Sequence, residues 1–361
     1  MRKQRFSVLL SRVGQCVCLL ALLVACGRPA PTEKKTEGKP VRQGDSLVIT
    51  DEVRLPCTPV KQQGHSSLCW IYAMLATIET EHLVQGDSVN LSPIYLTRQY
   101  LSTEAEAYYF AQGKGSMSQR GMAPMTLHLI DRYGVQPYDY YHAHQQTNMN
   151  VLWRRVGKLA RTASARRMGV ETYRKQLDDL LDQELGFMPR YVHMLGAEYT
   201  NGEFGRSVCM TDEWVALTSF THHPYGTRFQ LEVPDNVMDD TFLNVPLDTL
   251  MAIIDRSLGN GHPVCWEGDV SEEGFSFQKG FGTMKDAGDA AVRQREFESF
   301  QTTDDHCMVL VGLARDNAGR RYYLAKNSWG TGNRFGGYMY LSEDYVRLKT
   351  ICIVAHRDQL S

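Results

Sequence analysis

Apolar residues recur at helical spacing through the first half of the chain. The stripe that starts after Cys69 ends at Gly86 and consists of Trp70, Ile71, Met74, Leu75, Ile78 and Leu83. A second helix is predicted from Pro93 to residue 101, because Ser92 is a good N-cap and proline suits the first helical position. Residues 102–120 are predicted as a loop, and residues 123–134, 150–185 and 247–260 as further helices.

The period changes to that of strands in the second half of the chain. Apolar runs at 264–266, 308–312, 322–326, 337–341 and 350–354 predict strands. The turn residues at 316–319 join two of these runs as a hairpin. Helices in the first half and strands in the second half predict an α+β protein with two lobes and a cleft between them.

The first residues of the chain have the pattern of an export signal. Four basic residues precede an apolar run at 17–25, which is shorter than the ~20 residues that span a bilayer. The run ends in Leu-Val-Ala followed by Cys26, which resembles the lipobox of bacterial lipoproteins, where the Cys thiol receives diacylglycerol. An ordinary signal peptide with an incidental Cys is the alternative. We therefore expect a signal peptide at 1–25, lipid on Cys26, a flexible spacer over 26–46 and a main domain over 47–361.

Composition sets the class of protein and limits its partners. The chain has 361 residues, of which 43% are hydrophobic and 22% charged, as in globular proteins. A formal net charge of -2 gives no basic excess, so nucleic acid is not an expected partner. The lipid anchor would place the protein in the cell envelope, on the outer membrane. The sequence does not decide whether the protein faces the periplasm or the cell surface.

The cysteines do not form a zinc or disulfide pattern. Nine occur, and Cys16, Cys18 and Cys26 belong to the expected signal and anchor. The other six include no C-x-x-C pair, so we expect no zinc site among them, and most should be buried as small apolar residues. No metal or organic cofactor is expected for the chemistry described below. One of them can stay free for chemistry.

Cys69 is the candidate nucleophile. It stands where a loop becomes a long helix, and the partial positive charge at a helix N-terminus favours thiolate over thiol. Gln63 lies six residues earlier, where its amide can join the Cys69 N–H as an oxyanion hole. A buried structural Cys is the alternative.

Two later segments supply the remaining chemistry. His306 opens an apolar strand and suits a general base or the cation of a thiolate–imidazolium pair. Asn327, followed by Ser-Trp-Gly, ends the next strand, where its amide oxygen can orient the imidazole and Trp329 can shield that bond. Taken singly, each is as consistent with a structural His or a turn Asn.

Together these segments resemble the papain superfamily of cysteine peptidases in order and spacing. Ser66 stands where secreted papains carry a disulfide Cys, so the motif looks more like the bleomycin hydrolase and aminopeptidase C branch. Segments at 91–96, 222–226, 261–270 and 327–338 point to the same branch, so the resemblance covers about residues 50–355, with a helical insertion near 142–200. It implies a papain-like two-lobe fold with a helical N-terminal lobe, a β-barrel-like C-terminal lobe and the active site in the cleft between them.

The resemblance implies hydrolysis of peptides or unfolded proteins through Cys69, His306, Asn327 and Gln63, with a covalent acyl-enzyme. Relatives have Gly-Gly before the third helix, alongside the bound peptide. This chain has Arg120 followed by Gly121, and Gly121 is the expected substrate-binding glycine because a missing Cβ permits close approach.

Specificity and assembly stay open. The branch places its C-terminus in the cleft, which restricts it to aminopeptidase activity, but here only seven residues follow Val354. The sequence therefore does not decide between aminopeptidase and endopeptidase cleavage. It also does not decide whether the protein forms an oligomer like that of the branch. Two other classes are weighed: an inactive papain-like binding module, and a Cys-His acyl-transfer enzyme that acts on cell-wall peptides.

Overall fold

The computed structural model describes residues 41–43, 47–142, 147–194 and 196–360. The expected signal peptide, Cys26 and most of the expected spacer lie outside these residues. Within the spacer range, strand β1 (Val41–Gln43) pairs antiparallel with β2 (Leu47–Arg54), so regular structure starts a few residues before the expected boundary at 47.

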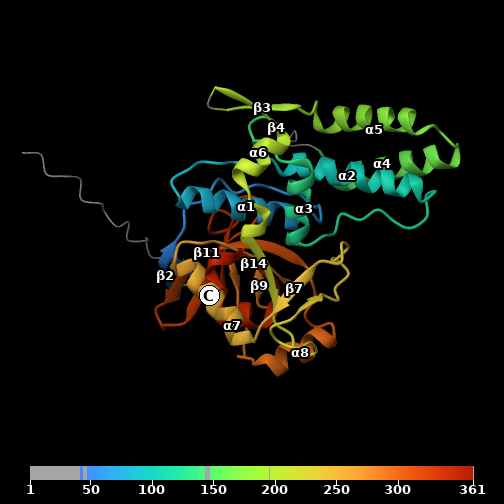
Figure 1. The fold of residues 1–361 in the computed structure, drawn as a ribbon. Coiled ribbons are helices and arrows are strands. Elements are labelled where there is room, and N and C mark those ends of the chain that lie inside the picture. Colours follow the sequence, from blue (N-terminus) through green and yellow to red (C-terminus); the bar gives the residue numbers. More distant parts are fainter. Residues whose placement is uncertain (1–40, 44–46, 143–146, 195, 361) are drawn as a thin grey trace, which may run out of the picture. The chain divides into compact units, whose positions relative to one another are not determined.

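Helix α1 (Cys69–Val84) is the centre of the helical layer. Its side chains from Trp70 to Glu81 are all buried, so the helix is enclosed on every side and not only along the predicted stripe. It packs against α2 (Pro93–Phe110) and α3 (Ala123–Tyr133) on one side and against the sheet on the other. Figure 1 shows these helices gathered on one side of the strands. A largely apolar helix that is buried on all faces occupies such an interior position, although α1 also buries polar side chains such as Thr77 and Glu79.

Helix α2 begins as predicted and ends later than predicted. The Ser92 hydroxyl accepts a hydrogen bond from the Tyr95 N–H at 3.1 Å, and Pro93 takes the first helical position. The helix continues to Phe110, through residues predicted as loop, because Ala105 and Tyr108 bury their side chains against neighbouring helices.

The range of the expected insertion holds two helices and a hairpin. Helices α4 (Met149–Ala165) and α5 (Val170–Leu185) pack on each other and on α2, and β3 (Tyr191–Met194) pairs with β4 (Ala197–Thr200). Helix α6 (Asn201–Val208) follows, capped by Thr200 and Glu203, and contacts α3. None of the described helices is long and apolar enough to cross a membrane.

The second half of the chain forms most of one large, mainly antiparallel sheet, to which β2 also belongs. Along its main path the strands follow the order β6-β7-β5-β14-β8-β11-β12-β13-β10-β9, and β2 pairs with β11 beside that path. The strands are β5 (Trp214–Thr218), β6 (Arg228–Gln230), β7 (Thr241–Asn244), β8 (Val264–Gly268), β9 (Phe275–Ser276), β10 (Phe281–Gly282), β11 (His306–Asp316), β12 (Arg321–Lys326), β13 (Tyr338–Ser342) and β14 (Thr350–His356). Helices α7 (Leu247–Gly259) and α9 (Glu343–Lys349) contact these strands, and α8 (Ala290–Glu298) contacts α9.

The sheet is bent but open, where a barrel-like lobe was expected. Among the described strands, no pairing joins β6 to β9. The bend lies in β11, whose first half pairs with β8 and whose second half pairs with β2. Its register shifts between Leu310 and Gly312 and between Leu313 and Ala314, and such irregularities bend a strand away from a flat ladder. The α+β fold is confirmed, and closure into a barrel is not.

The start of β11 and the start of α1 meet at the site. Helix α1 packs directly on β11 and β8. This contact brings the first residue of the helix, Cys69, to the first residue of the strand, His306.

Candidate active site

Cys69 is the first residue of α1 and is partly buried. The residue before it, Leu68, makes no side-chain cap bond. Because N–H groups in the first turn of a helix have no intrahelical partner, the start of α1 keeps donors available next to the sulfur. The predicted position of a nucleophile at a helix start is therefore the one observed.

Two hydrogen bonds lower the pKa of Cys69 well below its ordinary value. The larger contribution comes from the neighbouring thiol of Cys307, and a smaller one from the imidazole and positive charge of His306, while burial opposes both. Burial and the negative charge at Cys69 raise the pKa of Cys307, so Cys307 stays protonated and acts as the donor. The role of Cys307 was missed in the sequence, where it reads as a buried apolar residue.

His306 is held by Asn327. Its Nε2 lies 2.8 Å from Asn327 Oδ1, and both residues are buried, at 3% and 2% exposed. The same Oδ1 also accepts the Ser328 N–H at 2.7 Å, so this atom is an acceptor and His306 Nε2 carries the proton. The other ring nitrogen, Nδ1, is left for Cys69. This is the orientation that a base for the thiol requires.

Trp329 covers this pair and ties it to the loop before α1. The His306 and Trp329 ring centroids are 4.4 Å apart. Residues Gln62 and Trp329 form a β-bridge, and Gln62 Nε2 donates to the Trp329 carbonyl at 3.2 Å. The Asn-Ser-Trp-Gly segment and the loop before the nucleophile are thus bonded to each other, although they are far apart in the sequence.

Gln63 has a fixed amide. The Ser328 hydroxyl donates to its Oε1 at 2.5 Å, and its Nε2 donates to the Ser66 carbonyl at 2.8 Å. Two hydrogens are carried by Nε2, and one bond uses only one of them. The second remains for an oxyanion beside Cys69, which lines the same cleft.

The cleft has a volume of about 600 Å³ and its walls come from both halves of the chain. Besides Gln63, Cys69, His306 and Trp329, its lining includes Arg120, Asp235, Asp304 and Asp305. Arg120 pairs with Asp235 at 3.1 Å. No motif in the sequence identified Asp235 or Asp304 as part of the site.

Gly121 has a packing reason for lacking a side chain. A Cβ there would meet Met125 Cε at 2.1 Å and the Trp70 ring at 2.9 Å. It does not line the cleft, although the preceding residue, Arg120, does. Its role in binding substrate stays a prediction.

The comparisons with known proteins concern the fold and the C-terminal part of the chain. Residues 193–361, which include His306 and Asn327 but not Cys69, match the Peptidase C1-like family. The structure of PepW from Lactobacillus rhamnosis HN001 has a TM-score of 0.64 and 18% identity, covering 86% of this chain and 83% of that one. The chain therefore has a papain-like α+β fold, and its C-terminal part is similar to the Peptidase C1-like family.

The curated relatives that the chain matches include an aminopeptidase and a cysteine proteinase. Aminopeptidase G of Lactobacillus delbrueckii subsp. lactis is 26% identical over 161 residues, which are 42% of this chain and 37% of that relative. The mitochondrial cysteine proteinase 1 of Saccharomyces cerevisiae is 22% identical over 392 residues, covering 89% of this chain and 79% of the yeast protein. The chain thus spans little more than a third of the length of aminopeptidase G.

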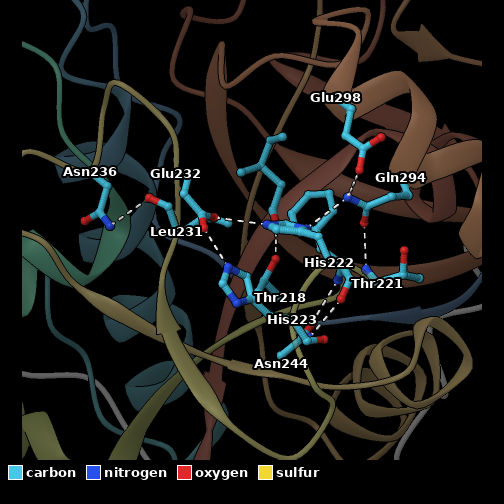
Figure 2. A network of polar contacts seen from close by, with 12 residues as sticks. Thr218, Thr221, His222, His223, Leu231, Glu232, Asn236, Asn244, Gln294 and Glu298 are labelled. Carbon is cyan, nitrogen blue, oxygen red and sulfur yellow. Dashed lines mark hydrogen bonds and ion pairs between the residues drawn. The ribbon is translucent and has the colours of Figure 1, made fainter.

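A second polar network is formed by residues that do not line the cleft (Figure 2). His222 Nε2 and His223 Nε2 lie 3.2 and 2.6 Å from the two oxygens of Glu232. The three groups are close enough together to hold a metal ion. However, Gln294 Nε2 donates to His222 Nδ1 while Gln294 Oε1 accepts the Thr221 N–H, which puts the proton of a neutral His222 on Nε2. His222, His223, Glu232 and Gln294 therefore form a hydrogen-bonded network, which explains this arrangement better than a metal site does.

This hydrogen-bonded network fixes the loop between β6 and β7. Glu232 holds the start of this loop, and Asp240, near its end, bonds His128 at 2.6 Å. Between them, Asp235 reaches the cleft and pairs with Arg120. One wall of the papain-like cleft is thereby a loop tied at three points.

Replacing Cys307 by alanine is expected to raise the pKa of Cys69. Wild-type Cys69 keeps its thiolate until the pH falls through a lowered pKa, and without the Cys307 donor this loss begins at higher pH. The acidic limb of the rate of alkylation by iodoacetamide should therefore move to higher pH. Cys265→Ala, a buried thiol nearby, is the control, and an unshifted limb in Cys307→Ala would contradict the assignment.

Proposed function

We propose that the protein is a cysteine-type peptidase that hydrolyses peptide bonds through Cys69, His306 and Asn327. The observation that carries this proposal is the hydrogen-bonded series from Cys69 through His306 to Asn327 at the wall of an open cleft. The relatives named aminopeptidase and cysteine proteinase support it.

In the first step, the Cys69 thiolate attacks the carbonyl carbon of the scissile bond. The electron pair of the carbonyl moves to its oxygen, which accepts hydrogen bonds from Gln63 Nε2 and from the start of α1. The oxyanion then collapses, the C–N bond breaks, and His306 Nδ1 gives its proton to the leaving amine. The product is a thioester on Cys69 and a neutral His306.

In the second step, water replaces the amine. His306 Nδ1 takes a proton from the water, and the hydroxide adds to the thioester carbonyl. Collapse of this second oxyanion breaks the C–S bond and returns Cys69 as thiolate and His306 as imidazolium. Asn327 keeps the ring in one orientation through both steps, because its Oδ1 accepts the Nε2 proton throughout.

Cleavage of a mixed peptide library, read by mass spectrometry, tests the proposal. Products that lose single residues from the amino terminus would assign aminopeptidase activity, and internal cuts would assign endopeptidase activity. Intact peptides together with unreactive Cys69 would favour an inactive binding module. Cleavage of muropeptides in place of linear peptides would favour an acyl-transfer enzyme of the cell wall.

We further propose that the peptidase is held at a membrane of the cell envelope by lipid on Cys26. The support is the lipobox-like sequence that ends at Cys26 and the polar stretch that follows it. Cys26→Ser is expected to move the protein from the membrane fraction to the soluble fraction after expression in a bacterial host. Cys57→Ser serves as the control, and a Cys26→Ser protein that stays on membranes through a carbonate wash would refute the anchor.

A further inference from the structure

The wall of the cleft that contains Asp304 is rich in carboxyl groups. Asp235, Asp304 and Asp305 line the cleft, and Arg120 is the single Lys or Arg among the described residues that line it. That guanidinium is already paired with Asp235. Asp304 and Asp305 have no Lys or Arg partner in the described part of the chain.

Asp304 is backed by a second buried carboxyl group, that of Glu267. Glu267 lies on β8, is 1% exposed, and is hydrogen-bonded to Asp304. Its Oε2 accepts the Ala123 N–H at 3.2 Å and the Cys352 thiol at 3.4 Å. Neither carboxyl group has a basic partner among the described residues, and Asp304 Oδ2 is buried without any hydrogen bond. A buried polar oxygen without a partner is unfavourable, and here it belongs to a residue of the cleft wall.

Both carboxyl groups hold protons more tightly than usual. Burial is the first cause, and it raises the pKa of Glu267 to about 8, although the hydrogen bond with Asp304 opposes this rise. Burial also raises the pKa of Asp304 well above its ordinary value, and the negative charge of Glu267 adds to this shift. A positive group that replaced the shared proton would compensate the charge that burial disfavours. The negative charge of Cys69 contributes to both shifts, so the pair lies close to the reacting sulfur.

We propose that Asp304, supported by Glu267, forms a subsite that recognises a cationic nitrogen of the peptide substrate. The nitrogen is either the free amino terminus or the side chain of a Lys or Arg close to the scissile bond. This inference rests on the proposed peptidase function and names the substrate class of that same cleft. Asp304 is a specificity-determining residue in this proposal, and the chemistry still belongs to Cys69 and His306.

Two matched pairs of fluorogenic substrates distinguish the sources of the cation. Leucine methylcoumarylamide against its N-acetyl form tests the free amino terminus. Acetyl-lysyl-leucine methylcoumarylamide against the acetyl-norleucyl compound tests a basic side chain. The wild-type protein is expected to prefer the cationic member of one pair by roughly tenfold or more in kcat/KM, the range expected for a hydrogen bond to a charged group.

Asp304→Asn should remove this preference. For the favoured cationic substrate we expect kcat/KM to fall by roughly tenfold, mainly through KM, while the neutral partner changes less than about threefold. Glu267→Gln, which keeps an acceptor for the Ala123 N–H, should give a smaller loss of the same kind. Asp286→Asn, an exposed acid outside the cleft, is the matched control, and thermal melting reports whether each variant is folded.

Hydrolysis without a cationic preference in either pair, or a preference that survives both substitutions, would overturn the subsite and leave the peptidase function standing. If no substrate is cleaved, the peptidase function fails by itself. The subsite is then judged by alkylation of Cys69 with N-(2-aminoethyl)chloroacetamide against N-propylchloroacetamide. A faster reaction with the cationic reagent that Asp304→Asn abolishes supports it, and equal ratios in both proteins refute it.

Discussion

Cys69→Ala is expected to abolish peptide hydrolysis while the fold is kept. No other described thiol stands at a helix start beside His306, so no second nucleophile can take over. The loss in kcat should be at least ~10⁴-fold, as for other enzymes that lose the nucleophile of a catalytic group. Rates with the best library peptide, measured on purified protein, check this.

The control for this variant is Cys57→Ala. Cys57 is also partly buried, but its thiol bonds the Leu55 carbonyl away from the cleft, so activity should be near that of wild type. Thermal melting of both variants separates a catalytic loss from a folding defect. Turnover close to wild type in folded Cys69→Ala protein would remove Cys69 from the mechanism.

Gln63→Ala is expected to lower kcat on the order of 10²-fold or more with little change in KM. The oxyanion exists only in the transition state and the tetrahedral intermediates, so a donor to it affects kcat and kcat/KM together. Because Ser328 and Ser66 hold the two ends of the Gln63 amide, the donor is fixed before substrate binds. Steady-state kinetics with active-site titration measures the effect.

Gln63→Glu is an informative companion variant. It preserves the size of the side chain but places acceptor oxygens where the donor stood, so it should lose as much kcat as alanine does. If Gln63 were only structural, the loss would appear in the melting temperature, and the titrated fraction would turn over normally. A raised KM with unchanged kcat would assign Gln63 to ground-state binding.

Local signals in the sequence predicted many element boundaries. The start of α2 followed from Ser92 and Pro93, and the stop of α1 from Gly86, because caps and breakers act within a few residues. The later end of α2 did not follow, since residues after 101 are helical through contacts of Ala105 and Tyr108 with distant segments. The sequence also did not predict that the sheet stays open, because closure into a barrel depends on which strands pair and not on any strand alone.

The residues of the site also fall into two groups, those that a sequence motif predicts and those that only the folded structure brings together. Cys69, His306, Asn327 and Gln63 were proposed because each sits in a recognisable motif. The structure brings Gln63, Cys69 and His306 into one cleft, and Asn327 is hydrogen-bonded to His306. Cys307, Glu267 and Asp304 were not found. Their importance arises only when α1, β8 and β11 come together, and a lone Cys or Glu in an apolar strand carries no sign of that approach.

The β-bridge between Gln62 and Trp329 bears on how the molecule is made. The nucleophile is synthesised early, but its base and the partner of its oxyanion loop come more than two hundred residues later. A ribosome that has completed only the first 300 residues has therefore made a chain without His306 or Asn327. Products of premature termination would be inert, and newly synthesised chains would be unable to digest one another before the last strands are in place.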